Sequence, residues 1–309
     1  MLNTLNKIVF AAIQGPDSTV AVAAAHDSAV LDAVVMARRC RISEPILVGH
    51  PEPIRRILAE LGEDPDTYQI VPGDSDVDCA HKAVALVAEG QAHFLMKGIL
   101  GTADLMRAVL HEPRLCTGAL LSHIMLFQAK GYPRMLLMTD GGLNTFPDLE
   151  KKGIILENAA GVLRTLGYDH INAACLCGAE VVNPKIESTV DAQRLSQMTD
   201  RWAPYHMSVI GPTSVDLALS PEACHHKGYS APGAGEADIL LVTNYEMGNA
   251  LYKSALVFAG CTSAGLVVGG KAPIILTSRS DSARSKLSSL ALGSVISQQN
   301  VDLSVPGLL

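Results

Sequence analysis

Uninterrupted apolar segments alternate with amphipathic ones, and this alternation constrains the fold more than any other feature. Residues 20–25 (VAVAAA), 45–49 (PILVG) and 93–98 (HFLMKG) have the pattern of buried strands, while 27–40 and 51–62 between them have the pattern of helices. Strands that are apolar on both faces and joined through helices are typical of a parallel sheet covered on both sides. The sequence therefore predicts an α/β protein built on parallel strands.

The same alternation resumes in the second half of the chain. Residues 133–140 and 237–244 have the pattern of strands, and 148–167 and 246–260 that of helices. Between them, the segment TDGGLNTFP (139–147) is rich in Gly, Asn and Pro, and we expect the chain to cross between two domains near it. A chain of 309 residues is long enough for two moderate domains.

Charge and cysteine content narrow the class of protein. The formal net charge of −7 disfavours a general binder of nucleic acid or of membrane surfaces, because a phosphate polymer is repelled on average. The longest uncharged run, 254–270, is shorter than a membrane span and is better explained as a helix, a turn and a strand. The start of the chain lacks the features of a secretory signal. Seven scattered cysteines are typical of a reduced, cytoplasmic protein.

The sequence does not predict a metal site. Cys175 and Cys177 would share one face of a strand, and His225 and His226 could join them. No C-x-x-C spacing or second cysteine pair supports such a site. The sequence also lacks a P-loop, a dinucleotide-binding glycine motif after a strand, and a G-x-S-x-G segment.

Polar residues and glycines gather where the expected strands end. In an open parallel sheet, ligands bind beyond the carboxyl ends of the strands. There glycine lets a backbone approach a ligand, and a helix N-terminus, lysine or arginine attracts an anion. Each group alone has an ordinary explanation as a turn, cap or exposed loop, but their coincidence predicts a shared anion-binding cleft. The residues concerned include Lys97, Thr102, Asn144, Gly248, Asn249, Lys253, Ser278, Arg279 and Asp281.

Several of these stretches together resemble the phosphate acyltransferases, the phosphotransacetylase and phosphotransbutyrylase group. They are LMKGILGTADLMRAVL (95–110), GPTSVDLALS (211–220), KGYSAPGAGEADILLVTN (227–244), EMGNALYKSALVFAG (246–260) and APIILTSRSDSARSKLSSLALG (272–293). The ordered set is specific, whereas any single piece is not. The resemblance implies reversible transfer of an acyl group between coenzyme A and inorganic phosphate in a homodimer or higher homo-oligomer.

The resemblance also implies an architecture. It is a two-domain parallel-sheet α/β fold like that of isocitrate and isopropylmalate dehydrogenases, with the active-site cleft between the domains. Carried over, residues 1–140 plus 283–309 form the first α/β domain and 141–282 the second, with the final helix folding back onto the first domain.

Individual roles follow from the same resemblance. Ser278 and Arg279 correspond to the family's catalytic pair, and Arg107 to a substrate-binding arginine. The G-N-x-x-Y-K segment places Gly248, Asn249 and Lys253 at the substrate. Asp281 is the nearest carboxylate to the pair and the candidate general base.

Two departures favour the butyryl branch of the family. Val257 stands where acetyl-specific enzymes carry an arginine, and Ser285 where they carry an aspartate. We expect acyl-CoA and phosphate as substrates and no metal or redox cofactor, because acyl transfer to a thiolate requires neither.

Three alternatives remain open at this point. One is a phosphate acetyltransferase of the same family. Another is a metal- and NAD-dependent decarboxylating dehydrogenase on the same architecture, although no convincing aspartate cluster supports it. The third is a non-catalytic acyl-CoA-binding protein.

Overall fold

The computed structural model describes residues 1–309 except 117, 278–280 and 299–309. The chain divides into two compact units. The first unit comprises Leu5–Ala119 and the described residues from Ser263 onward; the second comprises Leu120–Thr262 together with Met1–Thr4. The domains expected from the sequence, 1–140 with 283–309 and 141–282, differ from these units in where they place residues 1–4, 120–140 and 263–282.

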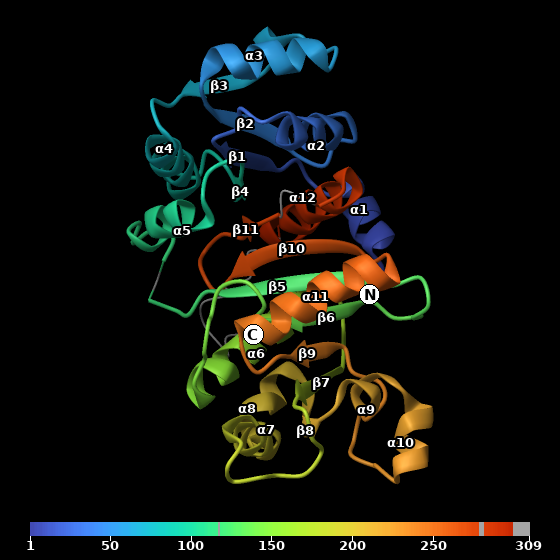
Figure 1. Cartoon of the computed structure of the whole chain (residues 1–309). Helices are drawn as coiled ribbons and strands as arrows, with labels where there is room; N and C mark the ends of the chain where they lie inside the picture. Colours follow the sequence, from blue (N-terminus) through green and yellow to red (C-terminus); the bar gives the residue numbers. More distant parts are fainter. Residues whose placement is uncertain (117, 278–280, 299–309) are drawn as a thin grey trace. The chain divides into compact units, whose positions relative to one another are not determined.

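The first unit is built on strands in the order β3-β2-β1-β4-β11-β10 (Figure 1). The strands are β1 (Thr19–Ala23), β2 (Glu44–Gly49), β3 (Gln69–Pro72), β4 (Phe94–Lys97), β10 (Thr262–Val268) and β11 (Ile274–Ile275). Neighbouring strands pair in parallel from β3 to β11, as the apolar runs predicted. Strand β10 pairs antiparallel with β11, because a short turn joins these two strands directly.

Six α-helices accompany these strands within the described part of the first unit. They are α1 (Leu5–Gln14), α2 (Ser28–Arg39), α3 (Pro51–Glu60), α4 (Asp76–Ala88), α5 (Thr102–Leu110) and α12 (Ala283–Gln298). The side chain of Asp27 caps α2 by accepting from Val30 N. A short 3₁₀ turn, η1 (Pro65–Thr67), precedes β3.

The final helix packs onto the first unit, as the family resemblance implied. Helix α12 lies beside α1 and α2 (Figure 1). The Ser18 hydroxyl donates to Ser294 Oγ at 2.8 Å, and Gln298 Nε2 donates to Pro16 O at 2.6 Å. Small residues allow this close packing, since a Cβ on Gly293 would lie 2.7 Å from the Ile275 side chain.

The second unit contains strands in the order β5-β6-β9-β7-β8. They are β5 (Ser122–Gln128), β6 (Leu136–Thr139), β7 (Ile171–Leu176), β8 (Met207–Thr213) and β9 (Ile239–Leu241). The last four pair in parallel, and β5 pairs antiparallel with β6. The helices are α6 (Leu149–Thr165), α7 (Glu187–Gln197), α8 (Thr199–Trp202), α9 (Val215–Leu219), α10 (Pro221–Lys227) and α11 (Tyr245–Ala259), with the 3₁₀ turn η2 (Ala203–Tyr205).

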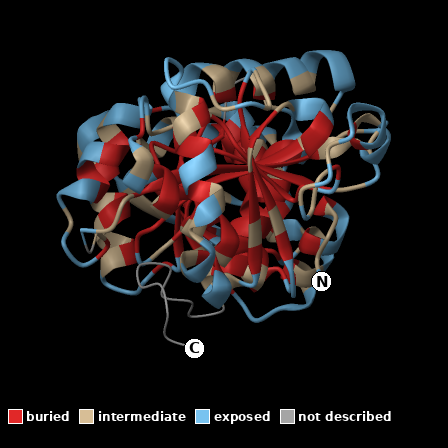
Figure 2. Ribbon diagram, turned by 90° about the horizontal axis from the view of Figure 1, so that it is seen from below, coloured by how far each residue is buried: buried red, intermediate tan, exposed pale blue. Residues whose placement is uncertain are grey.

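The sequence did not predict helix α1, strand β5 or the two short helices α9 and α10. Burial follows the sheets, because the strands other than β3 are almost wholly buried, whereas most helices, with α12 as an exception, are exposed along one side (Figure 2). Among the described residues, no helix is both long and apolar enough to cross a membrane.

Candidate active site

In the first unit, the loop after β4 is built around Gly98 and Lys97. A Cβ on Gly98 would lie 2.2 Å from Ala24 O, so this position requires glycine. Lys97 is only 8% exposed, and its Nζ donates to Gly98 O at 3.1 Å and Leu100 O at 3.2 Å. In this structure Lys97 therefore fastens the turn that leads into α5.

Helix α5 begins directly after this turn. Its N-cap residue is Gly101, which has no side chain. The N–H groups of the first turn therefore receive no hydrogen bond from a capping side chain. Thr102 is the first residue of the helix and is exposed. Arg107 lies in its last turn with its side chain 62% exposed, and its Nη1 pairs with Asp104 Oδ1 at 2.9 Å. An ion pair this exposed is weak, which leaves Arg107 able to exchange its partner for an anionic ligand.

The segment between β11 and α12 contains Ser278 and Arg279, which lie outside the described residues. Asp281 is partly buried, and its backbone carbonyl accepts from Lys286 Nζ at 3.0 Å. Ser282, not Asp281, caps α12, because the Ser282 Oγ accepts from Ser285 N at 3.1 Å. Ser285 is 3% exposed, and its Oγ accepts from Ser263 N at 3.3 Å, so this serine serves packing rather than a substrate.

Two histidines that the sequence analysis missed lie at the ends of β1 and β2 in the same unit. The ring centroids of His26 and His50 are 4.5 Å apart. Nδ1 of His26 is buried and has no hydrogen-bond partner among the described residues, and Nε2 lies 4.0 Å from Asp76 Oδ1. Burial lowers the pKa of His26, and the neighbouring His50 lowers it further, whereas Asp76 and Asp27 oppose the shift.

In the second unit, the Asp140 carboxylate organises the loop after β6. It is 2% exposed and accepts from the backbone N–H groups of His123 (3.0 Å), Gly142 (2.9 Å), Leu143 (2.8 Å) and Asn144 (3.3 Å). Asn144 Nδ2 also donates to Asp140 at 2.6 Å and to Leu121 O at 2.9 Å. The amide N–H groups of Asn144, a predicted substrate-binding residue, thus hold the loop in this structure.

This loop packs against the first turns of α11. Asn244 caps the helix by accepting from Met247 N at 2.9 Å, and Tyr245 N donates to Thr145 O at 3.1 Å. A Cβ on Gly248 would lie 2.6 Å from the Gly141 Cα. A glycine is therefore needed at position 248 because the helix and the loop pack closely there. The sequence had suggested a different reason, the close approach of a ligand to the backbone.

Asn249, Lys253 and Val257 follow one another at four-residue intervals on α11 and so share one face of the helix. Asn249 is partly buried and Lys253 is exposed. Val257 is 76% exposed. An amide, a cation and an apolar side chain in this order can contact the polar and the apolar parts of one ligand.

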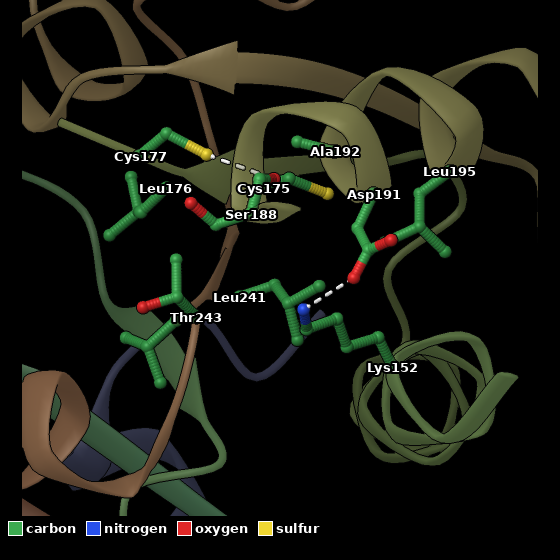
Figure 3. A pocket seen from close by; sticks show the side chains of 11 residues that line it. Lys152, Cys175, Leu176, Cys177, Ser188, Asp191, Ala192, Leu195, Leu241 and Thr243 are labelled. Carbon is green, nitrogen blue, oxygen red and sulfur yellow. Dashed lines mark hydrogen bonds and ion pairs between the residues drawn. The ribbon is translucent and has the colours of Figure 1, made fainter. Parts of the chain in front are cut away.

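Beside the ends of β7 and β9 lies a buried ion pair that the sequence did not reveal (Figure 3). Lys152 Nζ on α6 and Asp191 Oδ2 on α7 are 2.7 Å apart, and the two side chains are 8% and 7% exposed. Cys177 Sγ donates to Ser188 O at 3.3 Å, and burial raises the pKa of both Cys175 and Cys177. The charges neutralise each other and the thiols are protonated, so this cluster joins α6 to α7. Within the described part of the chain, no three His, Cys, Asp or Glu side chains form a metal-binding group.

The predicted site residues thus fall into two sets. Lys97, Thr102, Arg107 and Asp281 belong to the first unit, and Asn144, Gly248, Asn249 and Lys253 to the second. Most lie at or beyond the carboxyl ends of strands, as predicted. The signals that could have identified Asp140 are its place after a strand and the glycines that follow it. Nothing in the sequence connects Lys152 with Asp191.

Comparison with known proteins identifies the family. Residues 73–293 match the model described as phosphate acetyl/butaryl transferase. The phosphate butyryltransferase of Clostridium acetobutylicum is 39% identical over 96% of this chain and 99% of its own length. The phosphate acetyltransferase of Thermotoga maritima is 38% identical over 94% of this chain and 99% of its own.

A solved structure agrees with this assignment. The branched-chain phosphotransacylase of Enterococcus faecalis superposes with a TM-score of 0.79 at 33% identity, over 91% of this chain and 99% of that one. The family suggested by the strand-end motifs is confirmed. The chain belongs to the phosphate acetyl/butyryl transferase family and is an acyltransferase.

Proposed function

We propose that this acyltransferase reversibly moves a short acyl group between coenzyme A and inorganic phosphate, and that it prefers butyryl-CoA to acetyl-CoA. The observation that carries the proposal is the match along nearly the whole chain to relatives named phosphate butyryltransferase and phosphate acetyltransferase. The chain is almost equally similar to a phosphate butyryltransferase and to a phosphate acetyltransferase. The acyl preference is therefore argued from the residues of the site.

Two regions support phosphate binding. At the start of α5, the N-cap residue Gly101 leaves amide groups uncapped by a side chain, and Arg107 lies on the same helix in a weak surface ion pair. Amide groups at a helix N-terminus and a guanidinium are both suited to phosphate oxygens. On α11, Lys253 adds an exposed ammonium group. We propose Arg279, Arg107 and Lys253 as the groups that hold phosphate, with Lys97 and Asn144 holding the loops that carry the site.

The proposed reaction needs one base and one oxyanion donor. The thiol of coenzyme A loses its proton to a base, for which Asp281 is the candidate, and the thiolate attacks the carbonyl carbon of the acyl phosphate. The hydroxyl of Ser278 donates to the tetrahedral oxyanion, an interaction typically worth about 3 kcal/mol. The bond between the acyl carbon and the bridging oxygen of the phosphate then breaks, and phosphate leaves with the electron pair of that bond. This chemistry requires no metal or redox cofactor.

The acyl preference rests on Val257. This side chain follows Lys253 by one helical turn on the same face, where an arginine would bring a second cation close to the acyl end. Two additional methylenes in an apolar environment stabilise binding by about 0.8 kcal/mol each, which corresponds to a preference of roughly tenfold.

The experiment is a steady-state assay of thiol release from acetyl-, propionyl- and butyryl-CoA with phosphate, compared by kcat/KM. A rise with chain length supports the butyryl assignment, and Val257→Arg should reduce or reverse it. The matched control is Ser254→Arg, an exposed position on the same helix outside the Asn249–Lys253–Val257 face.

The same assay discriminates the alternatives. A preference for acetyl-CoA makes the enzyme a phosphate acetyltransferase. Binding of coenzyme A without turnover indicates a non-catalytic acyl-CoA-binding protein. Magnesium-dependent reduction of NAD indicates a decarboxylating dehydrogenase.

The chain is further proposed to form a homo-oligomer, most simply a homodimer, in the cytoplasm. Phe258, at the end of α11, is 87% exposed, and burying this side chain against a second copy of the chain would stabilise a dimer. All seven cysteines are free, which is consistent with a reducing compartment. Sedimentation equilibrium of wild type and Phe258→Ser tests the oligomer.

A further inference from the structure

A second cavity lies within the second unit, at the opposite ends of its strands from Asp140 and Asn244. Arg134 precedes β6, Tyr168 precedes β7 and Asp238 precedes β9, and these strands are adjacent and parallel. Their amino ends therefore meet at one edge of the sheet. The cavity that they line has a volume of about 200 Å³, enough for on the order of six water molecules or a small metabolite.

Asp238 and Arg134 form the charged part of this cavity. The Asp238 side chain is 5% exposed and pairs with Arg134 Nη2, and its second oxygen accepts from Asn172 N at 2.9 Å. Each oxygen of the carboxylate therefore has a hydrogen-bond partner. Arg134 is 37% exposed, and its other N–H groups have no partner in the described part of the chain. Because a guanidinium carries five N–H donors, most of its donor capacity is left for a ligand.

Tyr168 supplies an uncharged donor. It is 7% exposed and lines the cavity, yet its hydroxyl makes no hydrogen bond within the described residues. A ligand in the cavity can therefore accept a hydrogen bond from this hydroxyl. Burial raises the pKa of Tyr168 to about 12, which keeps the hydroxyl protonated and able to donate.

The start of the chain forms one wall of the cavity. Leu2 N donates to Leu166 O at 2.7 Å, which anchors residues 1–4 beside the turn that carries Tyr168. Met1, Asn3 and Thr4 line the cavity together with His170. Segments from four separate parts of the chain thus converge on it.

We propose that this cavity is a second binding site, separate from the acyl-transfer site, for a small anion whose carboxylate or phosphate group is held by Arg134 and Tyr168. The donors determine the class: the free groups are guanidinium N–H and phenol O–H, while the acidic group is already satisfied. Carboxylates and phosphates are the ligands that match a guanidinium and an adjacent hydroxyl donor. The volume limits the ligand to a few heavy atoms beyond its anionic group.

The test is isothermal titration calorimetry of the full chain with three probes: succinate, glycerol 3-phosphate and inorganic phosphate. Phosphate also reports on the acyl-transfer site, so each titration is repeated with Tyr168→Phe, which removes only the hydroxyl. We expect at least one probe to bind wild type and to bind this variant about fivefold more weakly. Its kcat/KM for acyl transfer should remain at the wild-type value.

Arg134→Met should weaken the same probe further, but it also removes the partner of a buried carboxylate. The double variant Arg134→Met/Asp238→Leu avoids this uncompensated charge and should likewise lose the probe. Succinate as the stronger probe would indicate a carboxylate ligand, and glycerol 3-phosphate a phosphorylated one. The proposal is overturned if no probe binds, or if every probe binds Tyr168→Phe as tightly as wild type.

Discussion

The backbones of Gly141 and Gly248 meet with no room for a side chain on either residue. A Cβ on Gly141 would lie 2.9 Å from the carbonyl carbon of Gly248, and a Cβ on Gly248 would lie 2.6 Å from the Cα of Gly141. This contact fastens the Asp140 loop to the first turns of α11, the helix that presents Asn249 and Lys253. Two glycines about a hundred residues apart thereby connect two of the segments proposed to form the site.

Gly248→Ala is expected to destabilise the protein by about 1–3 kcal/mol, because the added methyl group must displace backbone atoms. The shift of α11 should also lower kcat/KM. Ser254→Ala on the exposed side of the same helix is the control and should change stability by no more than about 0.5 kcal/mol. Urea denaturation measures both variants, and equal stabilities would show that the contact is not as tight as described.

Lys152→Met is expected to cost about 3–5 kcal/mol, because it leaves the Asp191 carboxylate buried without its partner. The double variant Lys152→Met/Asp191→Leu removes both charges and should regain most of that loss. A double-mutant cycle in urea tests the relationship. Additive single effects would contradict a direct coupling between the two side chains.

Stability should decline as the pH falls below about 6.5, with a contribution from His26. Its pKa is lowered in the folded state, so in the window beneath 6.5 the unfolded chain binds more protons, and acid favours unfolding. His26→Gln removes the titrating group and should flatten the melting temperature between pH 7.5 and 5.5. The exposed His225→Gln is the control and should leave the profile unchanged. A His26→Gln profile as steep as wild type would contradict the prediction.

Asp281→Asn is expected to lower the rate of acyl transfer most at low pH, with partial recovery as the pH rises and free thiolate becomes available. Because Ser282 caps α12, loss of a helix cap is expected from Ser282→Ala, at about 1 kcal/mol, and not from Asp281→Asn. A pH–rate profile parallel to wild type would place the general base elsewhere.

Arg279→Lys is expected to reduce kcat/KM strongly with little change in stability. Arg279 lies outside the described residues, and the expectation rests on its place after β11 and on the inability of lysine to grip phosphate with two parallel hydrogen bonds. Arg284→Lys is the matched control, since Arg284 is exposed and bonds only Asn6 among the described side chains. Near-normal turnover of Arg279→Lys would remove this arginine from the site.

The sequence by itself determined the alternation of elements, the parallel pairing of most strands and the family. Hydrophobic periodicity is local and persists over whole segments, so strands such as β1 and β2 can be predicted from their apolar runs without knowledge of the tertiary structure. The ordered motifs from Lys97 to Arg279 likewise predicted an anion site and resemble those of the family, because their residue types and order do not depend on knowing the contacts.

Tertiary structure decided what each polar or small residue does. That Gly248 meets Gly141, that Asn144 donates to Leu121 O and that Lys152 pairs with Asp191 are relationships between distant segments, which no local pattern encodes. The antiparallel direction of β5 and β10 was also beyond the sequence, because a strand's direction depends on its partner and not on its own residues. The Arg134–Tyr168 cavity likewise exists only because three parallel strands bring their amino ends to one edge.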